Sequence, residues 1–434
     1  MMYIDNILFA IILILGIGLF TKNVIKLKRN INLGRDVNRT DNPSARWKNM
    51  AMIALGQSKM IKRPIAGFFH IIVYVGFIII NLEVLEIIID GLFGTHRIFS
   101  FLGGLYGFLI GSFEILAVLV LFAVIVFWIR RNGIKLKRFV SSDLTGWPKN
   151  DANYILYFEV VLMSLFLIMN AFDLQFQTMN SGNVISQFLT PSPEIFSLIQ
   201  VEIIERVAWW IHICGILVFL NYLYYSKHLH ILLAFPNTYF ADLNPKGQLD
   251  DLESVTKEVK LMMDPTADPF AAQPADPNAV PQKFGASDVQ DLNWVQLLNA
   301  YTCTECGRCT SVCPANITGK KLSPRKIMMD TRDRMEEVGK NIDANKGVFV
   351  PDNKALLNDY ITPEELWACT SCNACVEECP VNISPLSIII DMRRYLVMEQ
   401  SAAPQSLNAM MTNIENNGAP WQYNQQDRLN WKNE

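Results

Sequence analysis

Two cysteine runs dominate the C-terminal part of the sequence: Cys303-Thr-Glu-Cys306-Gly-Arg-Cys309-Thr-Ser-Val-Cys313-Pro314 and Cys369-Thr-Ser-Cys372-Asn-Ala-Cys375-Val-Glu-Glu-Cys379-Pro380. In each run two residues separate the first three cysteines from one another, and a fourth cysteine precedes a proline. This spacing is typical of [4Fe–4S] ligation, and in two-cluster domains the fourth cysteine binds the other cluster. The spacing predicts one cluster on Cys303, Cys306, Cys309 and Cys379, and a second on Cys369, Cys372, Cys375 and Cys313.

Zinc sites and disulfide bonds are the other common uses of cysteine, and neither explains these runs. Structural zinc is usually held by two well-separated ligand pairs, which do not need this spacing twice. Disulfide bonds are rare in the cytoplasm, where charge patterning places this region. The ninth cysteine, Cys214, lies in an apolar stretch and is expected to be an ordinary buried residue. Because clusters carry electrons but make no bonds, no catalytic residue is expected in this chain.

The preceding sequence is strongly apolar. Of 434 residues, 51% are hydrophobic and 18% are charged, below the quarter or so that is typical of soluble domains. The net charge of −3 gives no indication of a nucleic-acid partner. Five apolar stretches are long enough, or nearly so, to cross a membrane, at about 5–21, 66–89, 105–129, 153–172 and 204–226.

Charge alternates between the segments that connect these stretches. Lys and Arg are frequent in 22–63 and 130–149, whereas 90–104 holds only Arg97 and 173–203 holds neither. The positive-inside rule therefore predicts an inner (cytoplasmic) membrane protein with its N-terminus outside and its C-terminal part in the cytoplasm. Positive charges follow the first stretch, which indicates a retained helix rather than a cleaved signal peptide. The alternative is that one weak stretch is a re-entrant or surface helix.

We therefore predict a mainly α-helical protein in four parts. Residues 1–235 form a five-helix transmembrane bundle, and 236–290 form an extended linker rich in Pro, Ala and Asp. Residues 291–400 form a cytoplasmic, α-helical, ferredoxin-like domain with two [4Fe–4S] clusters. Residues 401–434 form a polar tail that is expected to wrap a surface.

Histidine is scarce, and four of the five histidines lie in or beside the apolar stretches, where polar residues are costly and usually functional. His70 is expected at the same depth as His230, and two histidines on neighbouring helices at one depth can hold a b-type haem. His212 and His230, 18 residues apart, would share one face of a continuous last helix, with His228 on nearly the opposite face. The alternative is that these histidines are structural and hydrogen-bonded inside the bundle.

Three segments carry a resemblance to known families: Phe68-Phe69-His70, Trp210-Ile-His212, and Ser226-Lys-His-Leu-His230 ahead of Pro236. They resemble the membrane cytochrome b subunit of respiratory nitrate reductase and the cytochrome b of membrane heterodisulfide reductases. The resemblance implies that His70 and His230 bind an inner haem b, and that His212 serves an outer haem or a quinone site. The second outer ligand would fall about ten residues after His70, about three helical turns. This sequence has Ile80 and Asn81 there, which leaves the outer haem open, and His96 is not expected to replace them.

Two carboxylates of the second apolar stretch, Glu83 and Glu86, are candidates for proton transfer or quinone binding, because intramembrane acids are usually functional. The alternative is that the acids of the bundle are interfacial or paired with arginine. Glu202 and Glu205 could pair with Arg206 in this way.

Residues 291–430, including Ser406 to Trp421 and Arg428-Leu-Asn-Trp431, resemble iron–sulfur subunits of heterodisulfide reductase, anaerobic glycerol-3-phosphate dehydrogenase and glycolate oxidase. Such proteins often continue into Cys-Cys-Gly domains, but here no cysteine follows Cys379 and no Gly-rich flavin fingerprint occurs. The resemblance implies a subunit that transfers electrons between a cytoplasmic flavoprotein or Cys-Cys-Gly partner and the quinone pool. The alternatives are a subunit of a larger ion-translocating or assembly complex, and a haemless anchor for a ferredoxin domain.

Overall fold

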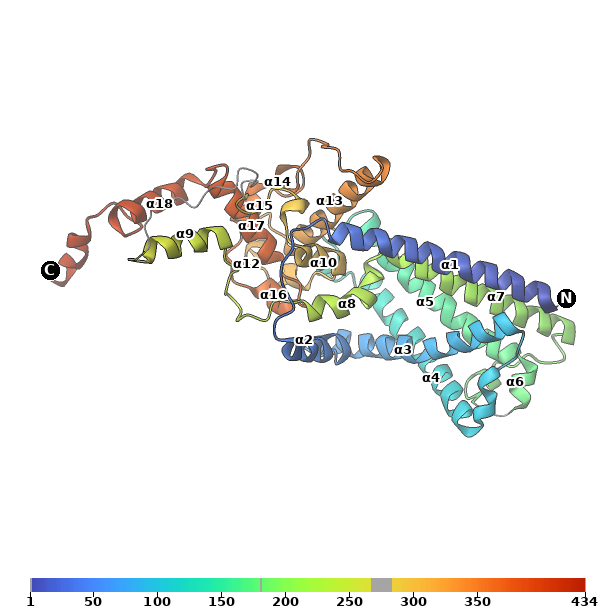
Figure 1. The fold of residues 1–434 in the computed structure, drawn as a ribbon. Helices are drawn as coiled ribbons and strands as arrows, with labels where there is room; N and C mark the ends of the chain where they lie inside the picture. The colour runs from blue at the N-terminus through green and yellow to red at the C-terminus, as the bar shows by residue number, and fades with distance from the viewer. Residues whose placement is uncertain (1, 180–181, 267–282, 434) are drawn as a thin grey trace.

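The computed structural model describes residues 2–179, 182–266 and 283–433. A bundle of long helices occupies one end of an elongated molecule, and a domain of short helices occupies the middle (Figure 1). The described residues contain no strand, and only two isolated bridges, Arg35 with Asn293 and Leu357 with Ile361, pair extended backbone. The predicted mainly α-helical fold is therefore confirmed for the described part of the chain.

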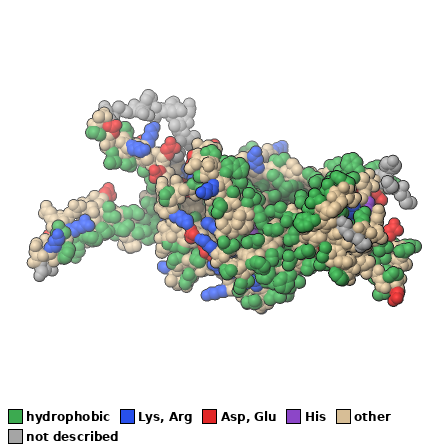
Figure 2. All heavy atoms as spheres, turned by 90° about the horizontal axis from the view of Figure 1, so that it is seen from below, with side chains coloured by type: hydrophobic (Ala, Val, Ile, Leu, Met, Phe, Trp, Pro, Cys, Tyr) green, Lys and Arg blue, Asp and Glu red, His purple; other side chains and the backbone are tan. Residues whose placement is uncertain are grey.

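Five helices in the described residues are long and apolar enough to cross a membrane, the number predicted: α1 (Met2–Ile31), α3 (Pro64–Phe93), α4 (Gly104–Trp128), α5 (Trp147–Phe172) and α7 (Leu198–Tyr222). Figure 2 shows hydrophobic side chains spread over this face of the bundle, with few charged side chains among them. The helix α1 continues beyond the predicted end at residue 21, because its last turns pack on the cysteine-rich domain. Asn30 Nδ2 there donates to the Tyr301 hydroxyl at 2.9 Å.

Local sequence sets the ends of these helices. Pro64 begins α3, where the missing N–H of proline costs no hydrogen bond. Gly94 ends α3 in the left-handed conformation, with φ of 68°. Ser197 and Gln200 form a capping box at the start of α7.

The cysteine-rich domain is built from eight helices: α10 (Trp294–Thr302), α11 (Arg308–Ser311), α12 (Pro314–Ile317), α13 (Pro324–Ala344), α14 (Leu356–Asp359), α15 (Pro363–Trp367), α16 (Ala374–Glu378) and α17 (Pro385–Met398). Its core includes Leu297 and Ile327, and the same buried cluster continues to Leu27 of α1 and Phe219 of α7. The end of the bundle nearest the domain therefore shares an apolar core with it, whereas a second buried cluster, which includes Phe9 and Phe166, fills the rest of the bundle.

Two short helices lie at the junction, α2 (Pro43–Met50) and α8 (His230–Tyr239), whereas α6 (Leu174–Thr178) lies at the far end of the bundle (Figure 1). Buried Asn237 of α8 donates to the Val381 carbonyl at 2.7 Å and accepts from Asn299 at 3.1 Å. These bonds tie the segment after the last span directly to the cysteine-rich domain.

The predicted linker and tail differ from expectation because both contain helices. Residues 236–290 include the end of α8 and the helix α9 (Glu253–Met263), and part of the linker prediction, 267–282, lies outside the described residues. The tail contains α18 (Gln405–Asn417) and projects away from the domain instead of wrapping a surface (Figure 1). Its Tyr423 and Trp431 are 75% and 69% exposed, so the tail lacks the apolar contacts that wrapping requires.

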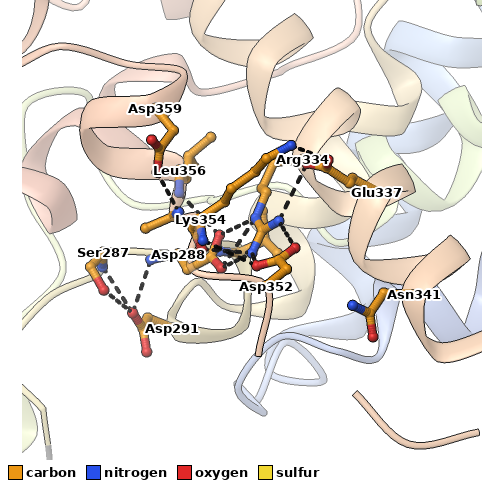
Figure 3. Close-up of polar contacts among 12 residues, drawn as sticks. Ser287, Asp288, Asp291, Arg334, Glu337, Asn341, Asp352, Lys354, Leu356 and Asp359 are labelled. Carbon is orange, nitrogen blue, oxygen red and sulfur yellow. Dashed lines mark hydrogen bonds and ion pairs between the residues drawn. The ribbon is translucent and has the colours of Figure 1, made fainter. Parts of the chain in front are cut away.

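A buried arginine cross-links the connection between α13 and α15. Arg334 of α13 is fully buried and pairs with Asp288 at 2.8 Å and Asp352 at 2.6 Å (Figure 3). It also donates to the Lys354 carbonyl at 2.8 Å. This network holds the loop before α14 against the domain.

Candidate iron–sulfur and histidine sites

The cysteines of the two runs gather around two small cavities. The first cavity is lined by Cys303, Cys306 and Cys309 of the first run and by Cys375 and Cys379 of the second. The second cavity is lined by Cys369, Cys372 and Cys375 of the second run and by Cys313 of the first. Each cavity thus receives three cysteines of one run and the fourth of the other, and the shared Cys375 shows that the cavities adjoin.

Both runs use the same backbone geometry around the second cysteine. The flanking residues are left-handed, with φ of 54° at Glu305, 70° at Gly307, 56° at Ser371 and 58° at Asn373. In this conformation the Ser371 N–H donates to Cys369 Sγ at 3.4 Å. Amide groups that point at sulfur stabilise negative charge there, which suits an anionic cluster.

The donor set fits iron–sulfur clusters better than a single ion. No group of three or more His, Cys, Asp or Glu side chains in the described ranges could hold one metal ion. The cysteines surround cavities instead of converging on a point. Burial raises the pKa of Cys303 and of Cys375 to about 12. Thiolate, not thiol, is the form that binds a metal, so binding of a cluster would release these protons.

Three histidines meet at the end of the bundle nearest the cysteines. The rings of His70 on α3 and His230 at the start of α8 are 6.5 Å apart between centroids, and His228 is 5.3 Å from His230. The Lys227 carbonyl is 3.1 Å from His230 Nδ1, whereas the buried Nδ1 of His70 has no hydrogen-bond partner. The structure therefore brings together the pair predicted from the sequence.

The prediction of a continuous last helix is wrong. The last span passes into a 3₁₀ turn at Leu223–Tyr225, a second at Lys227–Leu229, and then α8. This break turns the chain, so His228 lies beside His230 rather than on the opposite face. Three histidines therefore share one region, which helical periodicity could not indicate.

His212 and His96 lie apart from this group. His212 is buried against Phe166, with ring centroids 6.3 Å apart, and no second histidine is among its ring contacts in the described residues. His96 instead bonds Asp173 at 2.9 Å beyond the end of α3. The structure thus places no histidine opposite His212.

A polar cavity of about 550 Å³ lies at the end of the bundle away from the cysteines. Glu83 and Glu86 both line it, together with Arg97, Asp173 and Trp209. The Glu83 Oε1 pairs with Arg97 at 3.2 Å, and its buried Oε2 has no hydrogen-bond partner. Burial raises the pKa of Asp173, but the His96 hydrogen bond and the Arg97 charge outweigh burial and bring this pKa to about 2.

Two further acids of the bundle have partners, and one of them pairs with arginine, as the alternative expects of such acids. Glu205 accepts from Arg206 at 2.6 Å. Glu114 accepts from Asn170 at 3.0 Å and from the Ser186 N–H at 3.0 Å. The central role of Arg97 was missed in the sequence, although its position as the lone cation between the second and third apolar stretches was a usable signal.

The first cysteine run contacts both segments that lead to the histidine pair. Buried Arg308 donates to the Lys59 carbonyl at 3.3 Å and to Met60 Sδ at 3.4 Å, just before α3. Buried Glu305 pairs with Lys227 at 2.5 Å, three residues before His230. The loop between Cys303 and Cys309 is thereby fixed against the end of the bundle that holds the histidines.

Comparison with known proteins agrees with the iron–sulfur part of this site. Residues 302–383 match the family model of the 4Fe-4S dicluster domain. The chain is 30% identical to the probable iron-sulfur-binding oxidoreductase FadF of Bacillus subtilis, over 99% of this chain and 61% of that protein. It is 26% identical to the EtfAB:quinone oxidoreductase of Syntrophomonas wolfei, over 92% of this chain and 55% of that protein.

A third relative matches a shorter part of the chain. It belongs to the ferredoxin/F(420)H(2)-dependent CoB-CoM heterodisulfide reductase of Methanosarcina acetivorans, and it is 34% identical over 25% of this chain and 53% of that protein. The chain spans little more than half of the length of the curated relatives over which it matches most fully, 61% and 55%. No solved structure is significantly similar to it. The chain thus joins a 4Fe-4S dicluster domain to five candidate membrane helices, and it is similar to iron–sulfur oxidoreductases.

Proposed function

We propose that this chain passes electrons between a cytoplasmic redox partner and the quinone pool of the inner membrane. The observation that carries the proposal is the contact of the first cysteine run with the segments that precede His70 and His230. Cys303, Cys306, Cys309 and Cys379 would hold one [4Fe–4S] cluster, and Cys369, Cys372, Cys375 and Cys313 the other. These clusters supply one-electron carriers, and the adjoining cavities favour exchange between them.

His70 and His230 are proposed as the axial ligands of one haem b, which would supply a further electron carrier inside the bundle. The Lys227 carbonyl fixes the His230 ring through Nδ1, which leaves the other ring nitrogen available for a metal. His228 lies beside this pair and would limit access to it. A second haem has less support, because the His212 ring contacts Phe166 and has no histidine among its ring contacts in the described residues.

The polar cavity is the proposed site for quinone and its protons. Glu83 offers an unpartnered buried oxygen, and Glu86 accepts from Tyr106 at 3.0 Å. The aromatic side chain of Trp209 supplies an apolar wall. Thirteen residues separate His70 from Glu83, about 20 Å along α3, so the cavity and the histidine pair serve opposite ends of the bundle.

The orientation follows from charge, and the partner from exposure. The basic connecting segments favour a cytoplasmic dicluster domain and an outside N-terminus. Cys372 is exposed, whereas the first run is covered by the bundle. A flavoprotein or Cys-Cys-Gly protein would therefore exchange electrons at the second run, and the S. wolfei relative, whose name couples EtfAB to quinone, supports this kind of partnership.

A haem count on the detergent-purified chain tests the proposal. We expect about one b haem beside about eight cluster irons, measured by pyridine haemochrome and iron analysis. His70→Ala should abolish the haem, whereas the matched variant His96→Ala, at the other end of the bundle, should retain it. A haem-free chain would overturn the electron path through the bundle and leave a haemless anchor.

A subunit of a larger ion-translocating complex is the second candidate, favoured by the buried ion pairs of Arg97 with Glu83 and Asp173. Quinol-dependent reduction of the clusters in proteoliposomes separates the two functions. Reduction supports electron transfer with quinone. Its absence in haem-loaded protein would favour the ion-translocating complex.

A further inference from the structure

Three cationic side chains lie in the lining of the first cysteine cavity or beside residues that line it. Arg308 belongs to the first run itself and is buried. Lys59 donates to the Cys379 carbonyl at 3.2 Å, and Arg138 comes from the connection between α4 and α5. None of the three forms an ion pair with Asp or Glu among the residues that the structure describes.

Arg138 is placed against the run by backbone contacts. Its carbonyl accepts from Arg325 Nη1 at 2.8 Å, and a Cβ added at Gly307 would lie 3.1 Å from the same carbonyl. Its Nη1 is buried and makes no hydrogen bond. Burial lowers the pKa of Arg138, and the nearby charge of Cys306 opposes that effect. A buried guanidinium nitrogen without an acceptor points to an anion that completes the site.

Arg308 lies close to both the first cysteine cavity and the histidine pair. Its side chain contacts Lys59 and Met60, and it is among the charged neighbours of the His70 ring. At the second cavity, the comparable cation is Arg393, which donates to the Cys369 carbonyl at 2.5 Å. Positive charge is therefore concentrated at the cavity that faces the bundle.

We propose that Arg138 and Arg308 stabilise the reduced form of the cluster held by Cys303, Cys306, Cys309 and Cys379, and so make it the carrier that exchanges electrons with the membrane. This inference rests on the proposed function. Reduction adds one electron to the cluster, supplied through the second cluster, and no bond forms or breaks. Fixed positive charge beside the cluster favours the added negative charge, and the buried setting keeps the interaction strong.

An EPR-monitored redox titration of the purified full-length chain tests the inference. Arg138→Met should shift the reduction equilibrium of one cluster at least tenfold toward the oxidised form, which lowers its midpoint potential by about 59 mV. Arg138→Lys should retain more than half of the wild-type effect. Lys137→Met is the matched control, because Lys137 precedes Arg138 in the same connection but its side chain is exposed. It should leave both clusters unchanged.

Cys372→Ser identifies the signal of the second cluster, which should not respond to Arg138. If Arg138→Met fails to assemble clusters, Arg308→Met provides the same measurement. Unchanged potentials of both clusters would overturn the inference, and so would a shift confined to the haem, which would assign Arg138 to a haem propionate. Failure of the wild-type chain to bind clusters would instead overturn the proposed function.

Discussion

Replacing Arg334 by methionine is expected to destabilise the cysteine-rich domain by about 3–4 kcal/mol. Arg334 donates to Asp288 through Nη2 at 2.8 Å and to Asp352 through Nη1 at 2.6 Å (Figure 3). Hydrogen bonds to charged groups contribute about 1.5–3 kcal/mol each, and two carboxylates lose their partner. Because these carboxylates are 18% and 20% exposed, water compensates part of the loss. Methionine keeps the apolar stem, so packing changes little.

Hydrogen–deuterium exchange of the full-length chain measures this loss locally. Amides of α13 and of residues 346–356 should exchange roughly 100- to 1,000-fold faster, since about 1.4 kcal/mol is a factor of ten. The exchange rates of Arg334→Lys should lie between those of wild type and Arg334→Met, because lysine keeps the charge but loses the planar set of donors of the guanidinium group. The exposed pair of Lys321 with Glu364 gives the control, and Lys321→Met should change nothing. Equal protection in Arg334→Met and Lys321→Met would refute this reasoning.

The same network and its neighbours give further predictions. The Arg334 hydrogen bond lowers the pKa of Asp352 in the folded state. The stabilisation from this bond is therefore present above about pH 4 and is lost as the pH falls through the lowered pKa. The difference in the free energy of unfolding between wild type and Arg334→Met should become smaller in that pH range. Cys306→Ser and Cys372→Ser should each remove one cluster and halve the cluster iron, measured by iron analysis and EPR; loss of both clusters from either variant would show that they assemble as one unit. Asp143→Asn should raise amide exchange in residues 134–143, because buried Arg325 loses a partner at 2.5 Å, whereas unchanged exchange would contradict a role in joining bundle and domain.

Cysteine spacing and apolar length were sufficient to predict much of the molecule. The ligand runs are local, so their spacing is visible in sequence, and the match of residues 302–383 to a 4Fe-4S dicluster domain agrees with it. Five long apolar segments likewise have no stable alternative to helix in lipid, because every backbone polar group must bond internally. The helices inside the predicted linker and tail carried no comparable signal, because short amphipathic segments are ambiguous in composition.

What the tertiary structure decided is how distant segments meet. The sequence by itself specified His70 and His230 as a pair, but the break after α7 brought His228 to them, and a 3₁₀ turn of three residues leaves no periodic signal. Arg97, Arg138 and Arg308 read in sequence only as loop and surface charge. Arg97 pairs with the carboxylates of Glu83 and Asp173, whereas Arg138 and Arg308 form no ion pair with Asp or Glu in the described part of the chain. Both outcomes are set by packing between segments that lie apart in the sequence. Cluster ligands can be predicted from the spacing of cysteines along the chain, whereas the partners of buried charges are determined only when the chain has folded.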